Sequence, residues 1–127
     1  MRKAIQTNEA PAAIGPYVQA VKISCGEMVF CSGQIPLDAE SGEIVVGDVA
    51  VQTERVLHNL TAVLRAADCG LSDVVRTTIF LKSMNDFATV NEVYSRHFSE
   101  NPPARACVEV ARLPKDVLVE IDAIAMK

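Results

Sequence analysis

The residues whose types could do chemistry gather near the C-terminus, in the stretch Pro103–Val110, which reads PARACVEV, and in the strand-like run that follows it. Because successive side chains of a strand point to opposite faces, Arg105, Cys107 and Glu109 share one face, and Glu120 lies on the charged face of the next run. In one interpretation these charged faces are solvated or form salt bridges with each other. In the other, Arg105 binds an anionic ligand through its planar guanidinium and Glu120 transfers a proton. Spacing alone leaves both interpretations open.

Thiol catalysis by Cys107 is a further possibility, and it requires a base that activates the thiol. His58 and His97 are the available bases, but both lie on predicted helices and neither has an evident acid to orient it. The cysteines show no CxxC spacing and no local histidine partner, so a zinc site is not expected. We expect reduced thiols that pack as small hydrophobic side chains: Cys25, Cys31, Cys69 and Cys107.

Two upstream segments could line a ligand site. The run AIGPY at 13–17 is a rigid loop that ends in the hydroxyl of Tyr17, and CSGQIP at 31–36 ends a predicted strand at Gly33. A glycine in such a place lets a ligand approach the backbone closely. Ordinary turn chemistry explains each segment equally well.

The charge balance argues against a nucleic-acid partner. The chain of 127 residues has 16 acidic and 12 basic residues, a formal charge of −4, and no run of Lys or Arg. Tight nucleic-acid binding depends on neutralising phosphates, so this balance disfavours it. Because no apolar run follows Arg2 and Lys3, we expect neither a secretory signal nor a membrane span, and we expect a cytoplasmic protein.

The elements that must position these residues follow from periodicity and turn signals. We expect a helix that begins after an N-cap at Asp48 and ends near Gly70, and a second helix capped by Asn85 or Asp86, with a core-facing stripe of Phe87, Val90, Tyr94 and Phe98. Turn residues at Cys25-Gly26 predict an early hairpin between the second and third strands. The expected strands are 2–6, 19–24, 28–32, 73–82, 104–112 and 117–126.

This order of elements predicts one domain with an α/β or α+β sheet and two helices layered on one face. The core must consist of Val, Ile, Leu and Ala, because only 5% of the residues are aromatic. A sheet covered on one face leaves the other face apolar and open. Assembly of identical chains through that face is the expected cover.

Several of these segments together resemble one known family. They are AIGPY at 13–17, SGQIP at 32–36, NDFATVNEVY at 85–94 and PARACVEVARLPKDVLVEIDAIA at 103–125. They are similar to the motifs of the RidA family, the reactive intermediate deaminases also called the YjgF family, and the resemblance covers essentially the whole chain.

The resemblance implies a chorismate-mutase-like α/β (α+β) fold as a single domain over 1–127. The implied architecture is a mixed six-stranded sheet with two helices on one face, and a homotrimeric barrel with ligand clefts between subunits. The implied activity is hydrolysis of 2-imino acids and their enamine tautomers, such as 2-aminoacrylate and 2-iminobutanoate, to 2-keto acids and ammonia. These substrates are released by pyridoxal-phosphate enzymes such as serine and threonine dehydratases. No cofactor and no metal is implied.

The resemblance also assigns roles to residues. Arg105 corresponds to the arginine that holds the substrate carboxylate, and Glu120 to the acid that positions or protonates through a water. The residues implied to line the cleft are Tyr17, Gly33, Asn91 and Cys107.

Two other functions remain as alternatives. One is a sensor that binds 2-keto acids or similar carboxylates without turnover. The other is an endoribonuclease, as some family members are described. The acidic balance, the absence of a His-plus-Lys or metal-acid constellation and the lack of stacked aromatics weigh against the second alternative.

Overall fold

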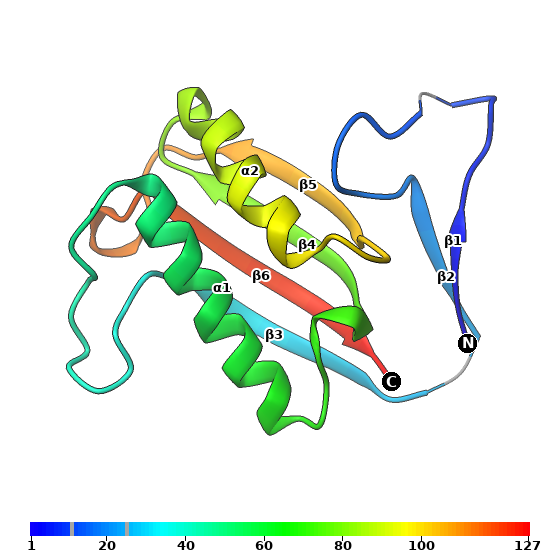
Figure 1. Ribbon diagram of the computed structural model, residues 1–127, viewed down its shortest axis with the longest axis horizontal. Helices are drawn as coiled ribbons and strands as arrows, with labels where there is room; N and C mark the ends of the chain where they lie inside the picture. The colour runs from blue at the N-terminus through cyan, green and yellow to red at the C-terminus, as the bar shows by residue number, and fades with distance from the viewer. Residues whose placement is uncertain (11, 25) are drawn as a thin grey trace.

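The computed structural model describes residues 1–10, 12–24 and 26–127, and its helices lie on one side of a twisted sheet (Figure 1). Each predicted helix and strand is present, with shifts of a few residues at the ends. The elements are β1 (Arg2–Ile5), β2 (Ala20–Ile23), β3 (Met28–Gln34), α1 (Val49–Ala66), β4 (Val74–Leu81), α2 (Phe87–His97), β5 (Ala104–Glu109) and β6 (Val119–Met126).

The main sheet has the strand order β3-β6-β4-β5. Strand β5 runs parallel to β4, whereas β6 is antiparallel to both β3 and β4. The sheet is therefore mixed, as predicted, and the chain is of the α+β class. The two C-terminal strands, β5 and β6, lie on either side of β4 and do not pair with each other.

The strands do not form one six-stranded sheet, and this expectation was wrong. Strands β1 and β2 pair only with each other, in a separate two-stranded sheet. The early hairpin between β2 and β3 is also wrong, because β3 pairs instead with β6 and places Cys31 opposite Ala123, both buried in the core. Burial of that face decides the partner of β3, and local turn residues carry no information about it. Cys25, in the expected turn, lies outside the described residues.

Alternation along the strands gives the main sheet two different faces. Under the helices lie the odd-numbered residues of β6 and of β4 from Thr77 onward, among them Thr77, Ile79 and Ile121, all fully buried. None of the described helices or strands covers the opposite face in Figure 1. Phe30 is 70% exposed there and Val108 is 40% exposed, so large apolar side chains face solvent on the bare side.

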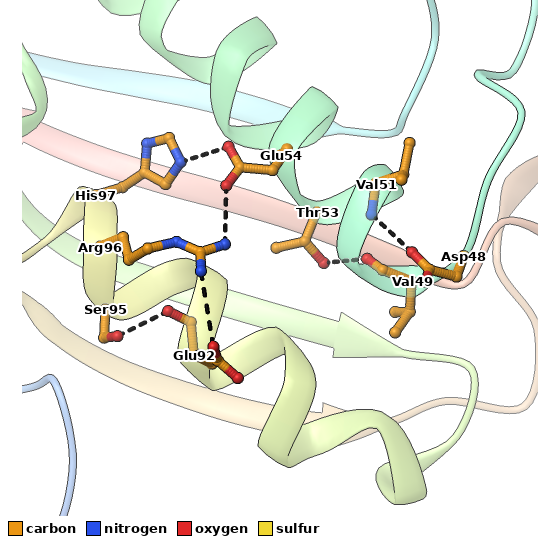
Figure 2. Close-up of polar contacts among 9 residues, drawn as sticks. All are labelled: Asp48, Val49, Val51, Thr53, Glu54, Glu92, Ser95, Arg96 and His97. Carbon is orange, nitrogen blue, oxygen red and sulfur yellow. Dashed lines mark hydrogen bonds and ion pairs between the residues drawn. The ribbon is translucent and has the colours of Figure 1, made fainter.

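Helix α1 begins as predicted, since the carboxylate of Asp48 accepts a hydrogen bond of 3.0 Å from the Val51 N–H (Figure 2). The predicted stop at Gly70 was wrong. The helix ends at Ala66, and the positive φ that terminates a helix falls on Asp68, at 56°. Aspartate tolerates this left-handed conformation better than most residues, although glycine is the usual choice.

A polar contact joins the two helices (Figure 2). Glu54 of α1 lies 2.7 Å from the Nε2 atom of His97 and 3.3 Å from the guanidinium of Arg96, both near the C-terminal end of α2. The contact holds α2 against α1 at that end. Within the described residues, no helix is long and apolar enough to cross a membrane.

The N-terminal segment is held against the start of β5. The Arg2 guanidinium donates hydrogen bonds to the carbonyl oxygens of Asn101, at 2.8 Å, and of Pro102, at 3.3 Å. The Val18 N–H donates to the Pro103 carbonyl at 3.2 Å. These bonds bring the loop at 13–17 beside Arg105.

Candidate functional site

A pocket of about 280 Å³ lies where the loop at 13–17, helix α2 and strand β5 meet. Tyr17, Asn91 and Cys107, which were expected to line a cleft with Arg105, all lie in this pocket. The residues that line it are Ile14, Tyr17, Phe87, Asn91, Arg105 and Cys107.

Secondary structure explains why these side chains converge. On α2, Phe87, Asn91 and Tyr94 are spaced i, i+4 and i+7, so they lie along one face of the helix. Parallel pairing with β4 sets Arg105 opposite the buried Thr77, which places the arginine side chain on the helix-covered side of the sheet.

Arg105 lacks a carboxylate partner in the described part of the chain, and its Nη1 atom is buried without a hydrogen bond. The Oδ1 atom of Asn91 is buried and unpaired in the same way. Unpaired buried polar groups are uncommon in folded proteins and require an explanation, of which a missing ligand is one. Among the described residues that line the pocket, the half-buried guanidinium is the only formal charge, so an anion suits it best.

Aromatic rings surround the guanidinium. Its Cζ atom lies 5.4 Å from the ring centre of Tyr17, 5.7 Å from that of Phe87 and 5.0 Å from that of Tyr94. Burial lowers the pKa of Arg105, and the nearby Tyr94 opposes that change. An arginine remains protonated at neutral pH even so, and it acts here as a fixed cation.

Cys107 lines the pocket without a base beside it. Burial raises the pKa of its thiol, against the opposing effect of the Arg105 charge. His58 is exposed on α1, and His97 is paired with Glu54 between the helices, an acid partner that the sequence did not reveal. Neither histidine lines the pocket, so the arrangement does not form a Cys–His pair.

Glu120 and Gly33 lie together, but on the opposite face of the sheet from Arg105. Glu120 of β6 pairs with Phe80 of β4, next to the pair formed by Ile79 and Ile121. Because Ile79 and Ile121 are buried under the helices, the neighbouring Glu120 points to the other face of the sheet. A Cβ atom at position 33 would lie 2.5 Å from the Oε2 atom of Glu120, so only glycine fits there without a shift of that carboxylate. Burial, followed by the nearby Asp122, raises the pKa of Glu120.

One chain therefore divides the predicted site into two half-sites. The first half-site contains Tyr17, Asn91, Arg105 and Cys107, and the second contains Gly33 and Glu120. Side chains on opposite faces of one sheet cannot contact the same small molecule.

Several residues around the first half-site were not predicted from the sequence. Phe87 and Tyr94 were expected to face the core, whereas both rings also contact the Arg105 guanidinium. Gly15 was missed as well, although a Cβ atom there would lie 3.2 Å from the Nη2 atom of Arg105. The i, i+4, i+7 spacing that includes Asn91 was the available signal for the helical part.

A larger hollow of about 460 Å³ lies beside α1 and is lined by Val45, Val51, Glu54, Arg55 and His58. Its acid and its guanidinium already have partners, because Glu54 pairs with His97 and Arg55 lies 4.0 Å from Asp38. The smaller pocket is the better candidate, because its cation is unpaired. Among the described residues, no three His, Cys, Asp or Glu side chains are grouped to hold a metal ion.

The fold defines the class of this protein, which is the α+β fold shared by the YjgF and L-PSP proteins. A model of the family described as Endoribonuclease L-PSP matches residues 7–127. The chain belongs to this family, which is the RidA family that its motifs resemble.

Individual relatives cover nearly the full length. The 2-iminobutanoate/2-iminopropanoate deaminase of Escherichia coli K12 is 53% identical over 130 residues, which span 100% of this chain and 99% of that protein. A solved structure from Thermotoga maritima has a TM-score of 0.78 at 54% identity and covers 100% of this chain and 98% of its own. The structure of E. coli TdcF with bound serine has a TM-score of 0.75 at 48% identity and covers 98% of each chain.

Proposed function

We propose that this protein is a hydrolytic deaminase of 2-imino acids and their 2-enamino tautomers, which it converts to 2-keto acids and ammonia. The substrates would be small products of pyridoxal-phosphate dehydratases, such as 2-aminoacrylate and 2-iminobutanoate. The observation that carries the proposal is the half-buried Arg105, whose Nη1 atom has no partner, in a pocket of about 280 Å³. Such a guanidinium matches a free carboxylate, which it can bind through two parallel hydrogen bonds.

The relatives support this choice of ligand. The E. coli protein at 53% identity is named as a deaminase of these imines, and the TdcF structure holds serine, a small carboxylate with a nitrogen on its α-carbon. We propose that Asn91, Tyr17 and Cys107 line the bound substrate beside Arg105. The raised pKa of the Cys107 thiol and the lack of a neighbouring base favour a lining role over nucleophilic catalysis.

We further propose that the site is completed between subunits of a homotrimer. Arg105 and Glu120 lie on opposite faces of one sheet, so the acid for the Arg105 pocket must come from a second copy. The bare sheet face, with Phe30 and Val108 exposed, supplies apolar surface for that assembly. In this arrangement Gly33 and Glu120 of one subunit complete the pocket of its neighbour.

The chemistry follows from this pairing. Arg105 fixes the substrate carboxylate, and Glu120 positions a water against the imine carbon and takes its proton. As the C–O bond forms, the C=N π electrons move to the nitrogen, which takes up a proton and leaves a carbinolamine. Protonation of the amine nitrogen, cleavage of the C–N bond and loss of the hydroxyl proton then release ammonia and leave the 2-keto acid. The raised pKa of Glu120 suits a carboxyl group that first accepts and then returns a proton.

A coupled assay tests the activity. Threonine dehydratase supplies 2-iminobutanoate, and 2-ketobutanoate is followed in a buffer that slows spontaneous hydrolysis. We expect the protein to accelerate keto-acid formation over dehydratase alone. An unchanged rate at any protein concentration would contradict the proposal.

Subunit mixing tests the shared site. Arg105→Ala and Glu120→Gln proteins, each expected to be inactive, are unfolded together and refolded. If a site takes Arg105 from one subunit and Glu120 from another, random mixing restores about one quarter of the sites. Recovery near that level supports the shared site, and no recovery despite mixed trimers contradicts it.

A carboxylate sensor without turnover is the second candidate, and one observation favours it. Among the described residues of a single chain, no carboxylate or imidazole lines the Arg105 pocket, so that chain alone could bind but not hydrolyse. Saturable binding of 2-ketobutanoate together with an unchanged rate in the coupled assay would select this function. Endoribonuclease activity is the less suitable candidate, because the net charge is −4 and no run of Lys or Arg offers a phosphate-binding surface.

We propose a cytoplasmic location, as a place where such imines are formed, and one functional domain over residues 1–127. The proposed reaction uses only side chains and water, so no cofactor is needed for it.

A further inference from the structure

Tyr94 is the most firmly held of the three rings around Arg105. Its side chain has no exposed surface, its hydroxyl lies 2.8 Å from the hydroxyl of the fully buried Thr77, and its ring centre lies 4.5 Å from that of Phe98. By contrast, Phe87 is 36% exposed at the pocket. Tyr94 is also the nearest ring, at 5.0 Å from the guanidinium carbon.

The position of this ring matters because of what Arg105 lacks. An arginine side chain has several rotatable bonds, and it loses rotamer freedom when it is fixed in one orientation. In the described part of the chain no carboxylate holds the guanidinium, and its Nη1 atom is unpaired. Contact with an aromatic face is attractive for a cation and leaves the N–H donors at the guanidinium edge available to a ligand.

Tyr94 acts as a neutral ring in this contact. Burial raises its pKa to about 12, although the hydrogen bond to Thr77 and the Arg105 charge oppose the change. The phenol is therefore protonated at neutral pH. It supports the arginine as an aromatic face and does not compete with a carboxylate ligand for the cation.

We propose that Tyr94, itself fixed by Thr77 and Phe98, is a positioning residue that holds the Arg105 guanidinium in the orientation that receives the ligand carboxylate. The cost of ordering the arginine is then met during folding and not during ligand binding. This inference rests on the proposed function, because it takes Arg105 as the carboxylate anchor. It adds a role for a residue of the α2 stripe that does not line the pocket.

Calorimetry with 2-ketobutanoate tests the proposal on the full-length protein. Tyr94→Leu removes the ring, and we expect the Kd to rise about tenfold, as for loss of a partly desolvated cation–π contact. Tyr94→Phe keeps the ring but leaves the Thr77 hydroxyl unpaired. We expect this variant to melt at a lower temperature and to keep its Kd within about threefold of wild type.

Val93→Ala is the matched control. It removes buried apolar volume from the same helix at a residue outside the Arg105 contacts, so it should lower the melting temperature and leave the Kd unchanged. If Tyr94→Leu does not fold, Tyr94→Met offers a longer and more adaptable side chain of similar volume, also without a ring, and should give the same rise in Kd.

A spectroscopic signature separates positioning from loss of stability. The Arg105 Nε–Hε resonance of ¹⁵N-labelled protein should shift in Tyr94→Leu and stay near its wild-type position in Tyr94→Phe and Val93→Ala. A wild-type Kd and an unmoved resonance in Tyr94→Leu would overturn the proposal. If Arg105→Ala binds 2-ketobutanoate as wild type does, the proposed function fails instead, so the two failures are distinct.

Discussion

The closeness of Gly33 and Glu120 predicts the effect of a larger side chain at position 33. In Gly33→Ala the new Cβ atom would lie 2.5 Å from Oε2, 2.9 Å from Cδ and 3.2 Å from Cγ of Glu120. The first two distances are shorter than carbon–oxygen and carbon–carbon contacts allow, so the Glu120 side chain must rotate away.

This substitution should separate stability from activity. A strained glutamate rotamer costs about 0.5–1.5 kcal/mol. Replacing a strand glycine by alanine returns roughly 0.5–1 kcal/mol. We therefore expect the free energy of unfolding to change by less than about 1 kcal/mol, while loss of a positioned acid–base group lowers the rate at least about tenfold.

Urea unfolding and the coupled imine assay measure the two quantities, with light scattering to check that the oligomer is unchanged. Glu120→Ala and the double variant Gly33→Ala/Glu120→Ala complete a cycle. In the double variant the new Cβ atom no longer meets the Glu120 carboxylate. Its free energy of unfolding should therefore be higher than that of Gly33→Ala, while its activity stays low. A Gly33→Ala protein with the wild-type rate would refute the assigned place of the Glu120 carboxylate.

Three further predictions concern the thiol and the helices. Cys107→Ser should keep substantial imine-hydrolysing activity, and its abolition in a folded protein would instead indicate thiol catalysis. Asp48→Ala should lower the free energy of unfolding in urea by about 1 kcal/mol, through loss of the α1 N-cap. Burial acts to raise the pKa of Glu54, but the hydrogen bonds from His97 and Arg96 outweigh burial and lower that pKa from its ordinary value of 4.5. The ionised Glu54 therefore stabilises the fold fully above pH 4.5, and this stabilisation is lost as the pH falls below 4.5. Glu54→Gln should therefore cost about a few tenths of a kcal/mol at neutral pH, because the side chain is 46% exposed, and an equal loss at acid pH would contradict this reasoning.

Local pattern predicted the elements of the fold better than their partners. The helical spacing of α1 and the Asp48 cap are properties of a short segment, and both were predicted correctly. The pairing of β3 with β6 joins segments almost a hundred residues apart, and burial of Cys31 against Ala123 decides it. A turn signal between β2 and β3 could not reveal that preference.

The site shows the same division. Strand alternation placed Arg105 and Cys107 on one face, which the shared pocket confirms. It could not indicate whether helices or solvent covered that face. The residue types of Arg105 and Glu120 suggested one cleft. Only the pairing of β4 with both β5 and β6 shows that the two side chains lie on opposite faces of the sheet.

The most direct test of the account compares wild type, Arg105→Lys and Arg105→Ala in the threonine dehydratase assay, with folding and oligomer size checked for each. We predict that wild type accelerates 2-ketobutanoate formation, that Arg105→Ala gives the rate of dehydratase alone, and that Arg105→Lys recovers little, because a lysine ammonium lacks the planar fork. An Arg105→Ala protein as active as wild type would contradict the central claim that this arginine holds the substrate.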